Sequence, residues 1–225
     1  FEEFHLTNQA ELYLYDANGQ QIKGAYTSNN NHVSGLFATE LIYGDAIILD
    51  LVCSQEDELT RIRISHLGYA YRDVEDFTQQ KGFGGSDFCE VNVSCSPEGN
   101  GWQEIKNGVV RIQVKVSGSA YWCTGTIVNN AREDNKPYLL TADHCAFQMG
   151  HYATPADLNQ WLFYFGYDGQ TCDDPLTEPT HKSMVGATKV SQGGNRGQTG
   201  SDFYLVLLNQ LIPADYNPYF SGWSA

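Results

Sequence analysis

The sequence lacks long apolar runs, an excess of positive charge and closely spaced cysteine pairs. Its longest apolar stretches, such as LVLL at 205–208, are too short to cross a bilayer as a helix, so we expect no membrane span. Thirteen Lys and Arg oppose 27 Asp and Glu, for a formal net charge of −14. Phosphate binding needs clustered basic side chains, so nucleic acid is excluded as a partner class.

The cysteines and histidines do not have the spacing of metal sites. No CxxC pair and no zinc-finger spacing occurs, so we expect no metal and no cofactor. Six cysteines at wide spacings are typical of an exported, disulfide-bonded protein. Phe1-Glu2-Glu3 is not a basic leader. An exported protein would therefore begin here after processing, or partway through a longer precursor.

The first 72 residues predict a small β-sandwich in an all-β chain. The composition is rich in Gly, Tyr and Phe (22, 14 and 11 residues) and has few helical patterns. Two alternating segments flank Asn18-Gly19, which indicates a hairpin. GLFATEL (35–41), DAIILDLV (45–52) and TRIRISHLGYAYR (60–72) read as further strands. The polar, Gly-rich segment 73–88 reads as a linker, and Lys81-Gly82 within it is a candidate processing site, although a linker can hold a lysine by chance.

Residues 89–225 predict a second β domain, built as a barrel. Five strand patterns recur there: GVVRIQVKVSG (108–118), WCTGTIVNN (122–130), KPYLLTADHC (136–145), WLFYFGYDG (161–169) and DFYLVLLNQ (202–210). Short helical turns are expected near Ala142 and at Thr154-Pro155, where a capping Thr precedes a first-turn Pro.

His144 and Asp202 are the candidate site residues. Cys123 and Cys145 end adjacent predicted strands. A bridge between them would contribute roughly 3 kcal/mol by closing a loop of about twenty residues. It would also hold the backbone beside His144, as a general base requires. Asp202 opens an apolar strand, where a buried carboxylate needs a partner such as a histidine N–H. The alternatives are a surface turn beside a disulfide for His144 and a strand cap for Asp202.

Taken together, these segments resemble the chymotrypsin-like serine peptidases, and more closely the bacterial lysyl endopeptidases. The resemblance rests on CEVNVSC (89–95), CTGTIVNN (123–130), TADHC (141–145), WLFYFGYDGQTC (161–172) and the SDF strand at 201–203. It covers residues 82–223. It departs from the family pattern at Asp143, where a small residue or a histidine is usual.

The resemblance implies the first barrel of a two-barrel peptidase, with His144 as general base and Asp202 orienting it. It implies disulfides Cys123–Cys145 and Cys95–Cys172, and it places the partner of Cys89 in the C-terminal half of the catalytic domain. Cys53 could pair with Cys89 or stay free. Residues 1–72 resemble the β-rich region ahead of the catalytic domain in some secreted relatives.

The nucleophilic serine of such a peptidase is not found after Asp202. Only Ser221 and Ser224 follow, and neither lies in a Gly-Asp-Ser-Gly type loop. We therefore expect the serine, and the C-terminal half that carries it, outside this chain.

The resulting hypothesis is a secreted or cell-surface bacterial serine endopeptidase. It would act on proteins or peptides, cleave after Lys, and process itself at Lys81. The alternatives are a non-catalytic binding or structural protein on a peptidase-like fold, and an adhesion module built on residues 1–72.

Overall fold

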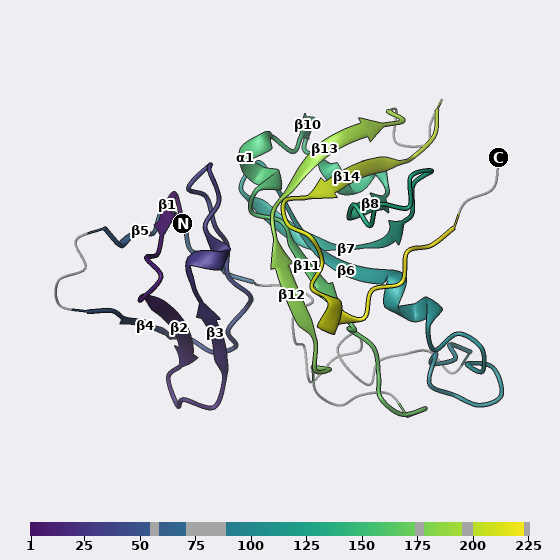
Figure 1. The fold of residues 1–225 in the computed structure, drawn as a ribbon, viewed down its shortest axis with the longest axis horizontal. Helices are drawn as coiled ribbons and strands as arrows, with labels where there is room; N and C mark the ends of the chain where they lie inside the picture. Colours follow the sequence, from purple (N-terminus) through teal and green to yellow (C-terminus); the bar gives the residue numbers. More distant parts are fainter. Residues whose placement is uncertain (55–58, 71–88, 174–177, 195–199, 223–225) are drawn as a thin grey trace.

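The computed structural model describes residues 1–54, 59–70, 89–173, 178–194 and 200–222, and these are almost all strands and loops (Figure 1). The predicted linker 73–88, with Lys81 and Gly82, lies outside the described residues. Within the described ranges, no helix has the length and apolar character needed to span a membrane.

Seven strands form one curled sheet in the C-terminal part. They are β6 (Val109–Val116), β7 (Ser119–Val128), β8 (Tyr138–Thr141), β11 (Leu162–Phe165), β12 (Lys182–Val185), β13 (Ala187–Gln192) and β14 (Tyr204–Leu208). The order across the sheet is β12-β11-β6-β7-β8-β14-β13.

The two ends of this sheet meet at Gly186, which alone separates β12 from β13. Its N–H donates to the Trp161 carbonyl at 2.9 Å, and its own carbonyl accepts from Asn209 at 3.1 Å. Its φ of +89° favours glycine, and an added Cβ would lie 2.5 Å from Asn209 Nδ2. The two end strands are therefore joined at one corner and the sheet is strongly curled. The predicted all-β, barrel-like fold is confirmed.

The barrel interior is filled by alternate residues of its strands. On β6, Val110, Ile112 and Val114 are fully buried, while Arg111 and Gln113 between them face outward. All four residues of β11 are buried. Further buried side chains of this core come from the other strands and from the loop before β11, among them Trp161, Phe163, Tyr204 and Val206. Burial of these side chains fixes the register of the strands that carry the site.

Two small sheets form the N-terminal part. One has the order β3-β2-β4, from β3 (Ile22–Tyr26), β2 (Glu11–Asp16) and β4 (Ile47–Val52); the other pairs β1 (Glu3–His5) with β5 (Arg61–Arg63). Both sheets contribute to one apolar cluster, made of Phe4, Leu6, Ala10, Leu12, Leu14, Tyr26 and Phe37.

The segment 35–41 is not a strand of either sheet, so that expectation is wrong. Gly35 and Phe37 instead make isolated backbone hydrogen bonds to Phe4 and Phe1, and Phe37 stacks on Phe4 at 4.2 Å between ring centroids. In the described part of the last predicted strand, residues 60–70, only Arg61–Arg63 form a strand, so it is shorter than its pattern suggests. Residues 71 and 72 of that prediction lie outside the described ranges. Both segments have strand-like composition, but aromatic packing and loop geometry decide their backbone conformation.

The predicted helical turns are confirmed. The short 3-10 helix η3 (Asp143–Ala146) follows Ala142, and α1 (Pro155–Leu158) has Thr154 as its N-cap. The Thr154 hydroxyl accepts the Asp157 N–H, and Asp157 accepts the Thr154 N–H in return. A two-stranded ribbon lies between them, formed by β9 (Phe147–Gln148) and β10 (His151–Tyr152). Further 3-10 turns are η1 (Ser28–Asn30), η2 (Ile105–Gly108) and η5 (Ala214–Tyr216).

Candidate active site

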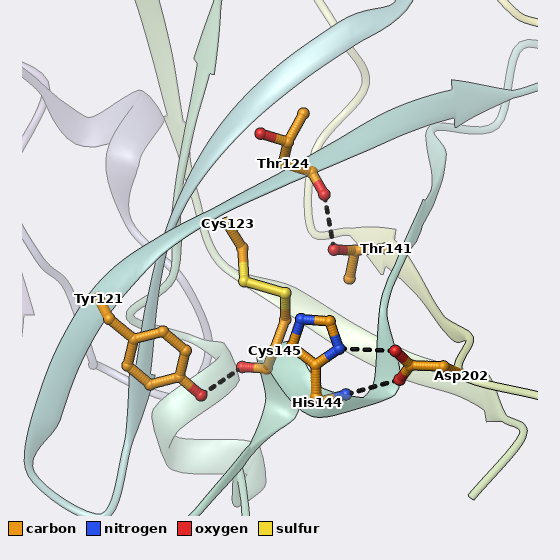
Figure 2. The surroundings of a disulfide bond; sticks show 7 residues. All are labelled: Tyr121, Cys123, Thr124, Thr141, His144, Cys145 and Asp202. Atoms are coloured by element: carbon orange, nitrogen blue, oxygen red, sulfur yellow. Dashed lines mark hydrogen bonds and ion pairs between the residues drawn. A yellow bond between two sulfur atoms is a disulfide. The ribbon is translucent and has the colours of Figure 1, made fainter. Parts of the chain in front are cut away.

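His144 is held at the end of β8 by three restraints on its neighbours. The Thr141 hydroxyl donates to the Thr124 carbonyl at 2.8 Å. The buried Cys145 is bonded to Cys123 on β7, and the Tyr121 hydroxyl donates to the Cys145 carbonyl at 2.7 Å (Figure 2). The His144 side chain itself remains 62% exposed. A fixed backbone thus presents an accessible imidazole.

Strand pairing brings Asp202 to His144 across 58 residues of sequence. On β14, Tyr204 lies opposite Thr141 of β8, so the residues just before β14 lie beside those just after β8. The Asp202 carboxylate contacts His144 twice: Oδ2 lies 2.6 Å from Nδ1, and Oδ1 accepts the backbone N–H at 3.0 Å (Figure 2). Two contacts to one residue fix the orientation of the ring.

The electrostatics of the pair favour an ionised Asp202. The hydrogen bond from the His144 ring holds the pKa of Asp202 below its ordinary value. Burial, the second-largest effect, acts in the opposite direction, and the backbone N–H of His144 adds to the lowering. An ionised carboxylate only accepts hydrogen bonds, so Nδ1 carries the proton. In the neutral ring, Nε2 is then the free base.

Asp202 is more exposed than its sequence position suggests. A buried carboxylate was expected, but 30% of the side chain is exposed. The reason is that Asp202 lies in the loop before β14 and not inside the strand. The expectation of full burial is wrong, while the histidine contact is present.

The second disulfide connects the segment before β6 to the loop after β11. Cys95 is bonded to Cys172, 77 residues away, beyond the end of β11. Both disulfides link the pairs that the resemblance implies. Cys53 and Cys89 are free and exposed, so the alternative of a bond between them is not realised here.

Of the two candidate serines, only Ser221 lies in the described part of the chain, and there it has no catalytic arrangement. Ser221 is held by main-chain bonds to Ile127 and Asn129 at the end of β7, and Ser224 lies outside the described residues. The expectation that the nucleophile lies outside these 225 residues stays a prediction.

A pocket of about 540 Å³ borders Cys123 and Thr124. Its wall includes Arg111, whose guanidinium carbon lies 3.7 Å from the Trp122 ring centroid and 4.4 Å from that of Tyr167. The pocket is also lined by Lys106 and Asp168, which form an ion pair with Lys106 Nζ 2.8 Å from Asp168 Oδ2. From the sequence, this pocket could be inferred only from the outward-facing positions of β6 and β7. Its other walls come from loops that are distant in sequence, and no local pattern predicts how these loops meet.

Comparison with known proteins agrees with this arrangement. Residues 83–225 match the family described as lysyl endopeptidase, C-terminal domain. The chain belongs to the lysyl endopeptidase family. It is also 25% identical over 225 residues to a lysyl endopeptidase of Pseudomonas aeruginosa. That match covers 94% of this chain and 43% of the relative, so the chain spans less than half of the relative's length. The resemblance read from the motifs is thereby confirmed at the level of a protease family.

Proposed function

We propose that this chain is part of a secreted bacterial serine endopeptidase in which His144 is the general base and Asp202 orients it. The observation that carries the proposal is the double contact of Asp202 with His144, at 2.6 Å to the ring and 3.0 Å to the backbone. A structural ion pair does not require an exposed imidazole with a fixed tautomer, whereas proton transfer to a substrate does.

The chemistry proposed is acyl transfer. A serine hydroxyl attacks the scissile carbonyl while His144 Nε2 takes its proton. His144 then returns that proton to the leaving amine, and water repeats the cycle on the acyl-enzyme. Asp202 stays ionised throughout and stabilises the imidazolium as it forms. No cofactor takes part in these steps.

The serine belongs, in this proposal, to a C-terminal half of the catalytic domain outside these 225 residues. The greater length of the Pseudomonas relative supports this placement. Cleavage after Lys is proposed from the family's name and from the relative. Residues 1–72 are proposed as an accessory region that is released by cleavage between Lys81 and Gly82, in the linker 73–88 that precedes a catalytic part at 89–225.

The proposal is tested by labelling the native protein with a fluorophosphonate, which reacts with activated serines. We expect one labelled serine, with His144→Ala slowing the reaction by about a thousandfold or more. His151→Ala is the control, because His151 is an exposed histidine on β10. Peptides with Lys, Arg or Leu before the scissile bond test specificity. A native protein that is not labelled would favour the non-catalytic alternative on a peptidase-like fold.

A further inference from the structure

Asp143, the residue directly before His144, is completely buried. Its Oδ2 accepts a hydrogen bond from the Tyr152 hydroxyl at 2.8 Å. Its Oδ1 is also buried and has no hydrogen-bond partner among the described residues. A buried carboxylate with incomplete hydrogen bonding is costly, and an apolar residue would serve stability better. The position therefore calls for a role other than packing.

Aromatic side chains surround this carboxylate, and two of them, Tyr152 and Tyr204, carry hydroxyl groups. Tyr152, on β10, packs edge-on against Phe147 at 4.9 Å between ring centroids. Tyr204, on β14, is fully buried, and its hydroxyl lacks a partner within the described ranges. Burial raises the pKa of Tyr204 to about 12, and the nearby Asp143 and Tyr152 add to the effect. Side chains from β10 and β14 thus surround the Asp143 carboxylate in the barrel interior.

The η3 turn, which begins at Asp143, also carries the proposed catalytic histidine. The N–H of His144, the next residue in the turn, donates to Asp202 Oδ1 at 3.0 Å. The turn therefore contacts Asp202 through the backbone of His144 and the barrel interior through the side chain of Asp143. A rotation of the η3 turn would break both sets of contacts together.

We propose that Asp143 is a positioning residue. Its buried carboxylate, bound by the Tyr152 hydroxyl, fixes the η3 turn so that the His144 ring and Asp202 keep their alignment. The inference rests on the proposed function of His144 as a general base. Asp143 itself touches no reacting atom and acts through the turn that carries His144.

The first test measures kcat and KM of variants of the native protein, with kcat normalised to sites titrated by fluorophosphonate. Asp143→Ala should lower kcat by about 10- to 100-fold and leave KM within about twofold, because misplacing a catalytic group affects mainly the chemical step. Asp143→Asn should restore most of the loss, since an amide oxygen still accepts from Tyr152. Tyr152→Phe, a milder change, should show a smaller loss in the same direction.

The matched control is Asp157→Ala. Asp157 is also a buried carboxylate in the barrel part, where it caps α1. Its removal should reduce stability but leave kcat per titrated site unchanged. If Asp143→Ala and Asp157→Ala have the same kcat, Asp143 has only a structural role and the inference is overturned.

A second test does not depend on activity. The Nδ1 proton shared by His144 and Asp202 should give a low-field proton NMR signal in the native protein and in Asp143→Asn. In Asp143→Ala it should broaden or move upfield. An unchanged signal in Asp143→Ala overturns the inference. If fluorophosphonate leaves the native protein unlabelled, the proposed function fails, and this signal still decides whether Asp143 positions the pair.

Discussion

At the residue scale, the site depends on one carboxylate that binds two atoms of one histidine. Asp202 holds both the ring and the backbone of His144, so the ring orientation is set by the turn and the loop together. The motifs around His144 and Asp202 indicate both residues as candidates from the sequence, and the structure brings the two side chains into contact. The link between Asp143 and Tyr152 could not be predicted, because it depends on the β9–β10 ribbon folding back beside η3.

Gly125, in the CTG motif, is predicted to be intolerant of any side chain. An added Cβ would lie 2.5 Å from Leu139 Cδ2 and 3.0 Å from the Leu140 carbonyl. Gly125→Ala should therefore cost about 1–3 kcal/mol in the free energy of unfolding, measured in urea. At Gly222 an added Cβ meets nothing within 4 Å, so Gly222→Ala should change stability by less than about 0.5 kcal/mol. Equal stability of the two variants would contradict the tight packing of β7 against β8.

At the element scale, β7, β8 and β14 bring the site together, and their apolar alternation made them predictable. β12 and β13 were not identified from the sequence. Gly186 interrupts their pattern, and β13 has mostly exposed residues after Ala187. Their strand conformation comes from pairing with β11 and β14, which is information from distant parts of the chain.

The two disulfides should have different effects on activity. Removing Cys123–Cys145 by a double alanine substitution should cost about 3 kcal/mol of stability and also lower kcat, because the bond adjoins His144. Removing Cys95–Cys172, which closes a longer loop, should cost about 4.5 kcal/mol with little change in kcat per titrated site. Unfolding curves and kcat values of both variants check this. A larger loss of kcat in the second variant would contradict the positioning role of the first disulfide.

At the scale of the whole molecule, a buried ionic cluster joins the N-terminal part to the barrel. Glu40 lies 2.9 Å from His181 Nε2 and 2.9 Å from Lys23, and it accepts from the Ser183 hydroxyl on β12. His181 Nδ1 faces the Pro179 carbonyl at 2.9 Å and Glu178 at 4.0 Å. Val185 also packs against the N-terminal cluster. No local pattern predicts these contacts, because Glu40 and His181 are 141 residues apart.

This cluster should make stability dependent on pH. Burial acts against both charges, but hydrogen bonds lower the pKa of Glu40 to about 2 and raise the pKa of His181 above its ordinary 6.5. The contribution of His181 is then fully present below pH 6.5 and is lost as pH rises through its raised pKa. The contribution of Glu40 is present above pH 4.5 and is lost as pH falls towards about 2.

The check is the unfolding midpoint of the native protein and of His181→Gln, measured from about pH 4.5 to about pH 9. The upper limit lies about 2.5 pH units above the ordinary pKa of histidine. The native midpoint should fall on the alkaline side, and His181→Gln should lack that fall. His151→Gln, which changes an exposed histidine, should behave like the native protein. Parallel curves for the native protein and His181→Gln would show that His181 does not contribute.

The most direct test of the central claim is kcat/KM of the native protein and of Asp202→Asn on a lysyl peptide. Asparagine keeps the shape of the side chain but favours the wrong histidine tautomer, so the account predicts a loss of about 10⁴-fold with nearly unchanged stability. Full activity of Asp202→Asn would contradict the account and remove Asp202 from the catalytic pair.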